Sequence, residues 1–310
     1  MQRRSIGQTG LSISVIAMGC GPVSNLMTGT DTPRQLAVVR QAIASGINWF
    51  DTAPGYGDGQ SERSLGQCLA ICDTHVETQI GTKVRLLRSG GESFREQIHG
   101  GLRRSLERLG RSSVALLQLH NAITSEPGEQ PFSVTPQEVL EPGGIADSMD
   151  ELREVGLIQA LGLTGTGCTA ALTNVLESRR FHTIQLPLNL LHTLPDADPQ
   201  PMQILAVCQA TGVSVLAIRI FAAGALLGRP TSAHTLKTPF FPLSLYQRDS
   251  VQSVQMCEGW TLGERLSRAV AFPLKRQPVA AAIAGWTSQT ELIEITQSLQ
   301  ENTNTHIHHK

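Results

Sequence analysis

The sequence predicts a single-domain (β/α)8 barrel that takes in residues 1–310. Two observations carry this prediction. Eight short runs rich in β-branched residues or leucine are each followed by a segment of helical periodicity, and the alternation fills the 310 residues without a break in composition. With 40% hydrophobic and 16% charged residues, the chain also has enough apolar side chains to bury one large core.

The first strand and helix show the local patterns on which the element assignments rest. A β-rich run covers 12–18, and a helix then begins with Asp31 or Thr32 as its N-cap and a proline in its first turn. Gly46 ends that helix, because glycine readily adopts the left-handed backbone of a helix C-terminus. A nearly continuous apolar run over 47–50 follows, which is typical of a buried strand.

The same alternation continues along the chain. Further strands are expected at 79–84, 114–120, 158–163, 183–187, 213–218 and 279–284, and further helices at 61–72, 92–109, 145–155, 169–179, 200–211, 260–273 and 289–300. The longest segments without periodicity, 121–144 and 220–258, follow the fourth and seventh strands. Both are therefore expected over the C-terminal mouth of the barrel, where barrels build active sites. Residues 301–310 are expected to form a frayed tail.

An open, doubly wound sheet with a dinucleotide-binding turn is the competing architecture. It requires a glycine-rich phosphate loop directly after the first strand. Gly19-Cys20-Gly21-Pro22 lacks the third glycine of that fingerprint and places a proline where the helix would begin. We therefore interpret this motif as a loop at the mouth of a barrel.

Charge and cysteine usage bound the class of ligand. Lys and Arg total 25 against 26 for Asp and Glu, a net charge of -1, so no bulk attraction to nucleic acid or anionic lipid is expected. No stretch approaches the roughly 18 uninterrupted apolar residues of a membrane helix, and the first residues do not resemble a signal peptide. The six cysteines are scattered and are expected to be reduced thiols. We expect a cytoplasmic protein with a small neutral or polar ligand, and no nucleic acid or membrane partner.

Polar side chains mark the C-terminal ends of three predicted strands. Asp51 ends the second strand, Lys83 lies in the third and His120 closes the fourth, with Tyr56 in the loop after Asp51. Because barrel strands all end at one mouth, these four side chains can converge. A lone buried charge is costly, so Asp51 and Lys83 are expected to pair. A lysine beside the Tyr56 hydroxyl would lower a pKa that is normally about 10 and make Tyr56 a usable proton donor.

Four ordered motifs resemble the signatures of the aldo-keto reductase superfamily. They are Asp51-Thr52-Ala53-Pro54-Gly55-Tyr56-Gly57, then Ser61-Glu62 with Leu65-Gly66, then Gly81-Thr82-Lys83-Val84, and then Leu117-Gln118-Leu119-His120. The similarity extends from the N-terminal strands through Gly285. The resemblance implies a (β/α)8 barrel, an NAD or NADP cofactor bound across its mouth without a Rossmann domain, and a catalytic tetrad at Asp51, Tyr56, Lys83 and His120. No metal-ligating residues are expected.

The chemistry of carbonyl reduction suits these four residues. A carbonyl that receives a hydride becomes alkoxide-like at its oxygen, which must be protonated as it forms. Tyr56 is expected to supply that proton, with His120 as a second hydrogen-bond donor, and to act as the base in the reverse oxidation. Lys83 and Asp51 are expected to tune Tyr56 without touching the substrate.

The resemblance also implies cofactor contacts, some of which depart from the family pattern. Relatives often carry Ser-Asn after the fifth strand, whereas this chain reads Leu163-Thr164-Gly165, so only Thr164 is expected to bind the nicotinamide carboxamide. Ile218 replaces an aromatic residue that commonly stacks on the nicotinamide. Arg219 is expected either to reach the cofactor pyrophosphate or an anionic substrate, or to lie on the surface. The expected cofactor-binding residues are Gly19, Cys20, Asp51, Thr164, Gln185, Arg219, Gly285 and Glu291.

Glu291 bears on the choice of cofactor. The segment over 283–292 aligns with the loop and helix start that bind the adenosine phosphate in the family, where NADP-preferring members place Arg or Lys. This chain instead has Glu291 near the position at which an arginine often clamps the 2′-phosphate. A carboxylate repels that phosphate and accepts a hydrogen bond from a ribose hydroxyl, so NAD is predicted to be favoured over NADP.

Three function classes compete. The leading hypothesis is an NAD(P)-dependent oxidoreductase that interconverts a small carbonyl and an alcohol, with an aldose or another small polar substrate. The alternative is a non-catalytic nicotinamide-binding regulatory barrel. A metal-dependent hydrolase or lyase is disfavoured, because the chain lacks a His-X-His cluster and Lys83 would repel a divalent ion. The sequence carries no indication of the oligomeric state.

Overall fold

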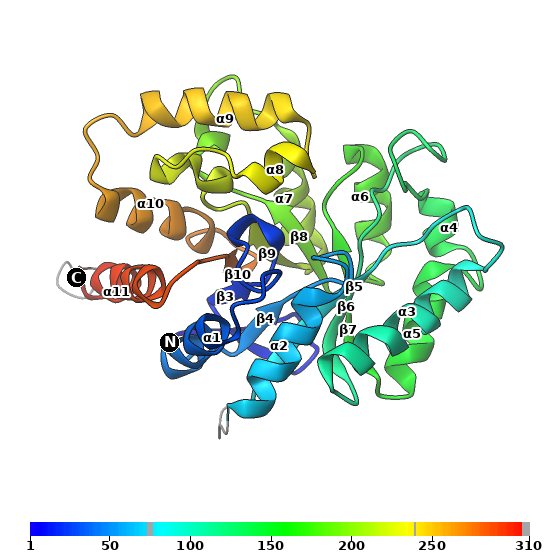
Figure 1. Cartoon of the computed structure of the whole chain (residues 1–310). Coiled ribbons are helices and arrows are strands. Elements are labelled where there is room, and N and C mark those ends of the chain that lie inside the picture. Colours follow the sequence, from blue (N-terminus) through cyan, green and yellow to red (C-terminus); the bar gives the residue numbers. More distant parts are fainter. Residues whose placement is uncertain (73–76, 239, 306–310) are drawn as a thin grey trace.

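The structure, a computed structural model, describes residues 1–72, 77–238 and 240–305. Its centre is a closed parallel barrel with the strand order β10-β3-β4-β5-β6-β7-β8-β9 (Figure 1). The barrel closes where Ala282 of β10 lies opposite Ile16 of β3, which confirms the predicted (β/α)8 fold. The strands are β3 (Ile16–Gly19), β4 (Trp49–Asp51), β5 (Gln79–Val84), β6 (Val114–Leu119), β7 (Ile158–Thr164), β8 (Thr183–Pro187), β9 (Ser214–Ile218) and β10 (Val279–Ala284).

The barrel strands are covered on both faces. Strands β5, β6 and β10 are buried at every position, as expected when helices pack around a parallel sheet that encloses its own core. Side chains alternate between the two faces of a strand, so Leu116 and Gln118 of β6 point the same way. Gln118 bonds the side chain of Asp51, and this alternation therefore directs polar groups to the interior beneath the mouth.

Helices return the chain along the outside of the barrel. The expected N-cap of the first helix is present, since the Asp31 side chain accepts the N–H of Arg34 at 3.1 Å. Gly46 has the left-handed φ of +84° that ends this helix region. The main helices are α1 (Thr32–Ala44), α2 (Gln60–Ile71), α3 (Phe94–Leu109), α5 (Ile145–Glu154), α6 (Thr169–Glu177), α7 (Gln200–Thr211), α10 (Leu262–Leu274) and α11 (Gln289–Thr305).

The C-terminal helix is longer than expected. Helix α11 runs to Thr305, so residues 301–305 of the expected tail are helical, while 306–310 lie outside the described residues. Over the described ranges, none of the helices combines the length and the apolar character needed to cross a membrane.

The N-terminal strand differs from its prediction. The expected single strand over 12–18 is divided into β2 (Ser12–Ser14), which pairs antiparallel with β1 (Arg3–Ser5), and the barrel strand β3. The Ser14 hydroxyl donates to the Ile16 carbonyl at 2.6 Å, and Asn48 Oδ1 accepts the Ser14 N–H at 2.7 Å. Val15, between the two strands, donates its N–H to the Gln2 carbonyl at 3.0 Å and accepts the Ala282 N–H at 2.8 Å, so the chain passes from the hairpin to the barrel at this residue. The hairpin packs its apolar residues against side chains of the barrel strands, closing the end opposite the mouth.

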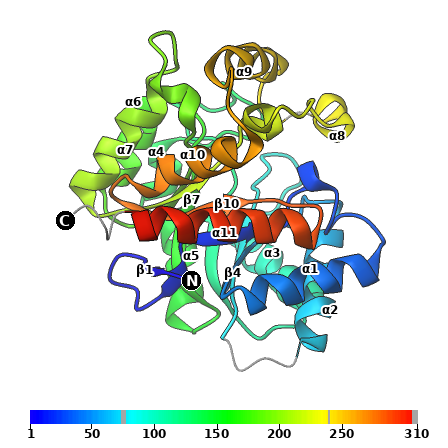
Figure 2. The ribbon, with the colours of Figure 1, turned by 90° about the vertical axis from the view of Figure 1, so that its left-hand side faces the viewer.

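The two long segments also contain regular structure. Segment 121–144 includes α4 (Pro136–Leu140), and segment 220–258 includes η3 (Ala222–Leu227), α8 (Ala233–Lys237) and α9 (Leu243–Met256). Segment 220–258 was expected to contain no helix, and that expectation was wrong: α9 is helical although it buries the polar side chains of Asp249, Gln252 and Ser253 and exposes Val251 and Val254. An apolar stripe was therefore missing from the sequence. Figures 1 and 2 show α8 and α9 above one end of the barrel, as expected for a mouth-covering segment.

Candidate active site

A cavity of about 840 Å³ opens at the C-terminal ends of the barrel strands, beside η3 and α8. Asp51 at the end of β4, Tyr56 in the following turn and His120 directly after β6 lie in its wall. Lys83 of β5 is 1% exposed, and its Nζ lies 4.9 Å from the centre of the Tyr56 ring. The structure therefore brings the four predicted tetrad residues together.

Asp51 and Lys83 form the buried ion pair that the sequence predicts. Lys83 Nζ lies 2.8 Å from Asp51 Oδ2 and donates a second hydrogen bond to the Thr52 carbonyl at 2.8 Å. The other oxygen of Asp51 accepts hydrogen bonds from the side-chain amides of Gln118, at 3.3 Å, and Gln185. Burial alone would lower the pKa of Lys83, but Asp51 and Tyr56 outweigh it, so its pKa is raised. Lys83 is therefore a fixed positive charge under the cavity.

Tyr56 is held by a turn whose sequence leaves little freedom. Its N–H donates to the Ala53 carbonyl at 3.1 Å, and the Gly59 N–H donates to the Pro54 carbonyl at 2.7 Å. Gly57 has a φ of +60°, and a Cβ there would lie 3.0 Å from Thr28 Cβ. Both the backbone conformation and the space thus require glycine beside the tyrosine.

The direction of the Tyr56 pKa shift differs from the sequence-based expectation. Burial raises its pKa above the ordinary value of 10.0, and this effect exceeds the lowering by the charge of Lys83 and by a hydrogen bond with it. Asp51 adds a smaller increase. The prediction that lysine acts to lower the pKa is correct for that one contribution but wrong for the net shift. Tyr56 is therefore a neutral phenol at physiological pH, the form required of a proton donor.

His120 completes the group as a neutral imidazole. Burial, together with the charges of Lys83 and Arg85, lowers its pKa well below the ordinary 6.5. Its ring meets the Tyr56 ring edge-on at 6.2 Å between centroids and stacks on Phe240 at 5.5 Å. A neutral imidazole has one N–H to donate, so Tyr56 and His120 can offer two hydrogen bonds to one substrate oxygen.

Thr164 has the clearest unmet hydrogen-bonding capacity among the predicted cofactor residues. It ends β7 and lies in the cavity wall, and its buried hydroxyl has no partner among the described residues. A Cβ at the neighbouring Gly165 would lie 2.8 Å from the Gln185 carbonyl oxygen. An asparagine at position 165 would therefore not fit, which explains the departure from the family pattern.

Arg219 lies in the cavity wall but its charge is already engaged. Its Nη2 lies 2.5 Å from Asp249 Oδ2 of α9, and its guanidinium is stacked on the rings of Phe241 and Tyr246 at 4.8 and 4.6 Å. The Asn189 side chain also bonds the Arg219 carbonyl at 3.0 Å. The interpretation of Arg219 as a surface guanidinium was wrong, since the pair is almost fully buried. Arg219 fastens α9 to the end of β9.

The remaining predicted cofactor residues divide into two groups. Gly19, Gly285, Gln185 and Glu291 lie in the cavity wall. Cys20 is fully buried, its thiol contacts the Met18 carbonyl at 3.9 Å, and it is not among the residues that line the cavity.

Glu291 has a cationic partner that its sequence neighbours do not supply. Its Oε1 lies 3.0 Å from Arg229 Nη1, and its Oε2 accepts the Thr287 N–H at 2.6 Å. Arg229 comes from the segment after β9, so no basic residue is evident near Glu291 in the sequence itself. The carboxylate is thus partly neutralised in the folded chain.

The sequence analysis also missed the cavity residues Arg85, Arg229, Phe240 and Phe241. Phe240 and Phe241 are adjacent in a chain with only 4% aromatic residues, which was an available indication of a functional surface. Arg85 follows Lys83 by two positions, the spacing that places both side chains on one side of a strand.

Comparison with known proteins identifies the family. The model of the aldo/keto reductase family matches residues 15–306. The chain belongs to this family. L-galactose dehydrogenase of Arabidopsis thaliana is 24% identical over 304 residues, covering 97% of this chain and 89% of the relative. D-threo-aldose 1-dehydrogenase of a Pseudomonas species is 25% identical over 310 residues, covering 92% and 89%.

The solved structures agree with the fold. The holo form of an aldo-keto reductase from Bacillus halodurans superposes with a TM-score of 0.70 at 20% identity, covering 96% of this chain and 91% of that one. Family membership confirms the enzyme class predicted from the four motifs: the aldo/keto reductase is a nicotinamide-dependent oxidoreductase that interconverts a carbonyl and an alcohol. In the described part of the chain, no group of three or more His, Cys, Asp or Glu side chains is placed to hold a metal ion.

Proposed function

We propose that Tyr56 protonates the substrate oxygen during carbonyl reduction and takes the proton back during alcohol oxidation. The observation that carries this proposal is the burial of the Tyr56 hydroxyl beside Lys83, with the neutral His120 facing the same cavity. Hydrogen-bond donors aimed at an oxygen that gains negative charge lower the barrier to reaction. His120 orients the carbonyl and Tyr56 gives up its proton as the charge develops.

Lys83 and Asp51 act through Tyr56. When Tyr56 loses its proton, the phenolate gains a cation whose Nζ is fixed by Asp51 and the Thr52 carbonyl. This placement favours the phenolate selectively, so the proton leaves more easily at the moment of transfer. Lys83 is not part of the cavity wall and has no access to substrate.

The cavity fits a nicotinamide cofactor, which supplies or accepts a hydride when bound. The unpartnered Thr164 hydroxyl is suited to its carboxamide. Gly19 and Gly285 expose main chain on the opposite wall, and a Cβ at Gly19 would lie 3.1 Å from the Ile283 side chain. We place the adenosine end near Glu291.

NAD is the proposed cofactor. Glu291 keeps a carboxylate at the cavity wall, where it repels a 2′-phosphate, and Arg229 is engaged by that same carboxylate. A 2′-phosphate would have to compete with Glu291 for Arg229.

The proposed substrate is a small polar aldehyde or an aldose, in the cytoplasm. Two relatives carry names of sugar dehydrogenases, and the cavity places ionic and hydroxyl groups beside the tetrad. All six cysteines are free, which supports a reducing compartment.

Binding and turnover, measured separately, test this function. Purified protein is titrated with NADH and with NADPH by fluorescence and thermal shift, and then assayed with aldoses in oxidation and small aldehydes in reduction. We expect binding of NADH and turnover that Tyr56→Phe reduces by about 10² to 10⁴. Cofactor binding without turnover of any carbonyl or alcohol would favour the non-catalytic barrel, and wild-type turnover by Tyr56→Phe would refute the proton path.

A further inference from the structure

Arg85 is a cation at the cavity wall, and within residues 1–72, 77–238 and 240–305 no carboxylate is paired with it. Its side chain lines the cavity together with Tyr56 and His120 and remains exposed to solvent. Among the described residues its only direct partner is the ring of Phe132, 5.3 Å from the guanidinium carbon. The other two arginines of the cavity wall, Arg219 and Arg229, are both paired with carboxylates.

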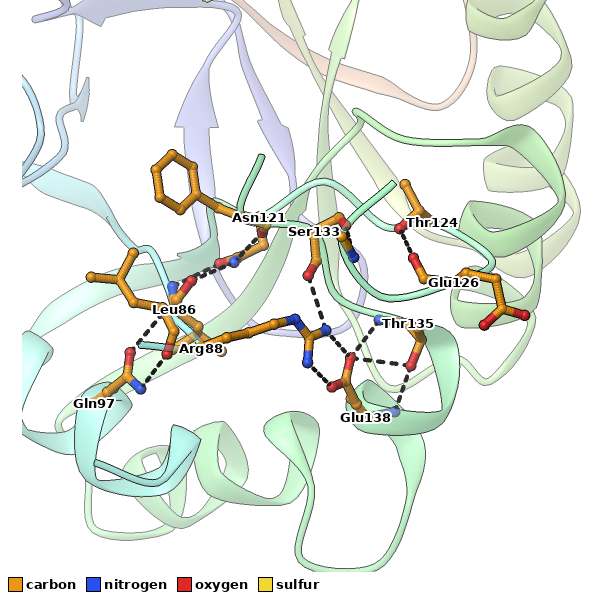
Figure 3. A network of polar contacts seen from close by, with 12 residues as sticks. Leu86, Arg88, Gln97, Asn121, Thr124, Glu126, Ser133, Thr135 and Glu138 are labelled. Carbon is orange, nitrogen blue, oxygen red and sulfur yellow. Dashed lines mark hydrogen bonds and ion pairs between the residues drawn. The ribbon is translucent and has the colours of Figure 1, made fainter. Parts of the chain in front are cut away.

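The main chain beside Arg85 is fixed by a buried network (Figure 3). The Asn121 side chain accepts the Leu86 N–H and donates to the Leu86 carbonyl, both at 2.9 Å. The same amide nitrogen donates to the Phe132 carbonyl at 2.5 Å. The buried Asn121 side chain thus fixes the main chain of Leu86, which follows Arg85. It also fixes the main chain of Phe132, whose ring contacts the Arg85 guanidinium.

A second set of contacts joins the segment after β5 to the segment that contains Ser133 and Glu138. Arg88 makes a two-pronged ion pair with Glu138, at 2.6 and 2.8 Å, and donates to the Ser133 carbonyl at 3.1 Å. Figure 3 shows Arg88 reaching across from the Leu86 segment to Ser133 and Glu138. The Arg88 guanidinium is therefore occupied by Glu138, whereas the Arg85 guanidinium has no carboxylate partner among the described residues.

The position of Arg85 separates it from the proposed cofactor contacts. Arg85 follows β5, next to β6 and His120, whereas Gly285 and Glu291 follow β10, and β3 and β4 lie between β5 and β10 in the barrel. Arg85 shares the cavity wall with Tyr56 and His120, and its charge contributes to the lowered pKa of His120, so it lies on the same cavity as the groups that would hold the reacting carbonyl.

We propose that Arg85 binds an oxyanion group, a carboxylate or a phosphate, carried by the carbonyl substrate. A guanidinium offers paired N–H donors that match either group, and burial of a bound ligand would strengthen those hydrogen bonds. This proposal rests on the proposed function and narrows its substrate class to anionic aldehydes. Arg85 is a specificity residue, since it has no proton to give and does not replace Tyr56 or His120.

Matched substrate pairs test the proposal. One pair is 4-carboxybenzaldehyde and its neutral amide, 4-carbamoylbenzaldehyde, and the other is glyceraldehyde 3-phosphate and glyceraldehyde. We expect wild-type kcat/KM to favour at least one anionic member by about tenfold or more. The pair with the larger ratio distinguishes a carboxylate from a phosphate ligand.

Variants assign the preference to one side chain. Arg85→Gln should lower the ratio of kcat/KM for the anionic aldehyde to that for its neutral partner by about tenfold, mainly through KM of the anionic aldehyde. Arg85→Lys should restore part of the preference, since it keeps the charge and loses the planar fork. Arg103→Gln, which removes a charge from the exposed face of α3 outside the cavity, serves as the control and should leave this ratio unchanged.

A binding measurement separates this proposal from the proposed function. Benzoate and inorganic phosphate are titrated against the NADH-loaded wild type and Arg85→Gln, followed by protein fluorescence. Weaker binding of either anion to Arg85→Gln, by about tenfold, would support the proposal even if no aldehyde were turned over. Equal anion binding by both proteins, or equal kcat/KM for charged and neutral aldehydes in the wild type, would overturn it and leave the reductase function intact.

Discussion

Replacing Lys83 with methionine should destabilise the protein in a pH-dependent manner. The substitution keeps the length of the side chain but leaves the Asp51 carboxylate, 4% exposed, without its cation 2.8 Å away. Removing one partner of a buried ion pair typically costs about 3–5 kcal/mol. Hydrogen bonds from Gln118 and Gln185 remain, so we expect the lower end, about 3 kcal/mol.

The expected change in melting temperature follows from the size of the chain. An unfolding entropy of about 2.1 cal/mol/K per residue gives about 0.65 kcal/mol/K for this domain. A loss of about 3 kcal/mol therefore corresponds to a decrease of roughly 5 °C. Thermal unfolding of the wild type, Lys83→Met, Asp51→Asn and the double variant measures it. The double variant should lose less than Lys83→Met, because it leaves no buried charge.

The pH dependence gives the sharper test. In the wild type, Asp51 and Tyr56 raise the pKa of Lys83 above its ordinary value of 10.5. A cation whose pKa is raised in the folded state contributes stability that is present below the unfolded value and lost as pH rises through the folded-state value. The deficit of Lys83→Met against the wild type should therefore be level between pH 7 and pH 9 and become smaller only at pH values above the ordinary lysine pKa. A deficit that disappeared between pH 7 and pH 9, or a double variant less stable than Lys83→Met, would refute the ion-pair reasoning.

Three further predictions concern the reaction. Tyr56→Phe should reduce kcat for reduction by about 10² to 10⁴ with little change in NADH affinity, because it removes only the proton donor; unchanged kcat in stopped-flow assays would exclude that role. Because the pKa of Tyr56 is raised from 10.0 and that of His120 is lowered from 6.5, kcat/KM for reduction should stay level between those two values and fall only at higher pH, as Tyr56 loses its proton; an inflection near neutrality would contradict this. Glu291→Gln should increase the NADPH to NADH ratio of kcat/KM by roughly tenfold by freeing Arg229, and Arg229→Gln should not.

The convergence of three of the four tetrad residues could be predicted from topology, whereas Tyr56, in the turn after β4, was assigned from the motif around it. Asp51, Lys83 and His120 stand at or near the ends of consecutive parallel strands, and a closed barrel brings every such end to one mouth. A buried charge also requires a partner, which made the pairing of Asp51 with Lys83 the only economical arrangement. The net pKa of Tyr56 was not predictable, since it depends on how completely the hydroxyl is buried.

The structure of segment 220–258, which covers the mouth of the barrel, could not be predicted from the sequence in the same way. Its helix α9 is held by the Arg219 to Asp249 ion pair and buries polar side chains, so its sequence has no apolar stripe. Arg229 meets Glu291 across 62 positions of the chain, and no local periodicity encodes such a contact. The preference for NAD over NADP was therefore inferred from the Glu291 carboxylate alone. In the folded site that carboxylate is paired with the Arg229 guanidinium.

The opposite pKa shifts of Tyr56 and His120 make one chemical arrangement. Burial keeps the proton on the phenol and keeps the imidazole uncharged, while the buried Lys83 remains a cation in contact with Tyr56. Tyr56 and His120 can therefore both donate hydrogen bonds to a carbonyl oxygen while neither carries a charge. The Lys83 cation stabilises the site mainly when Tyr56 gives up its proton and becomes a phenolate. Removing Lys83 should therefore slow the proton-transfer step more than it weakens ground-state binding, and a variant that changed KM alone would show that the lysine serves only the fold.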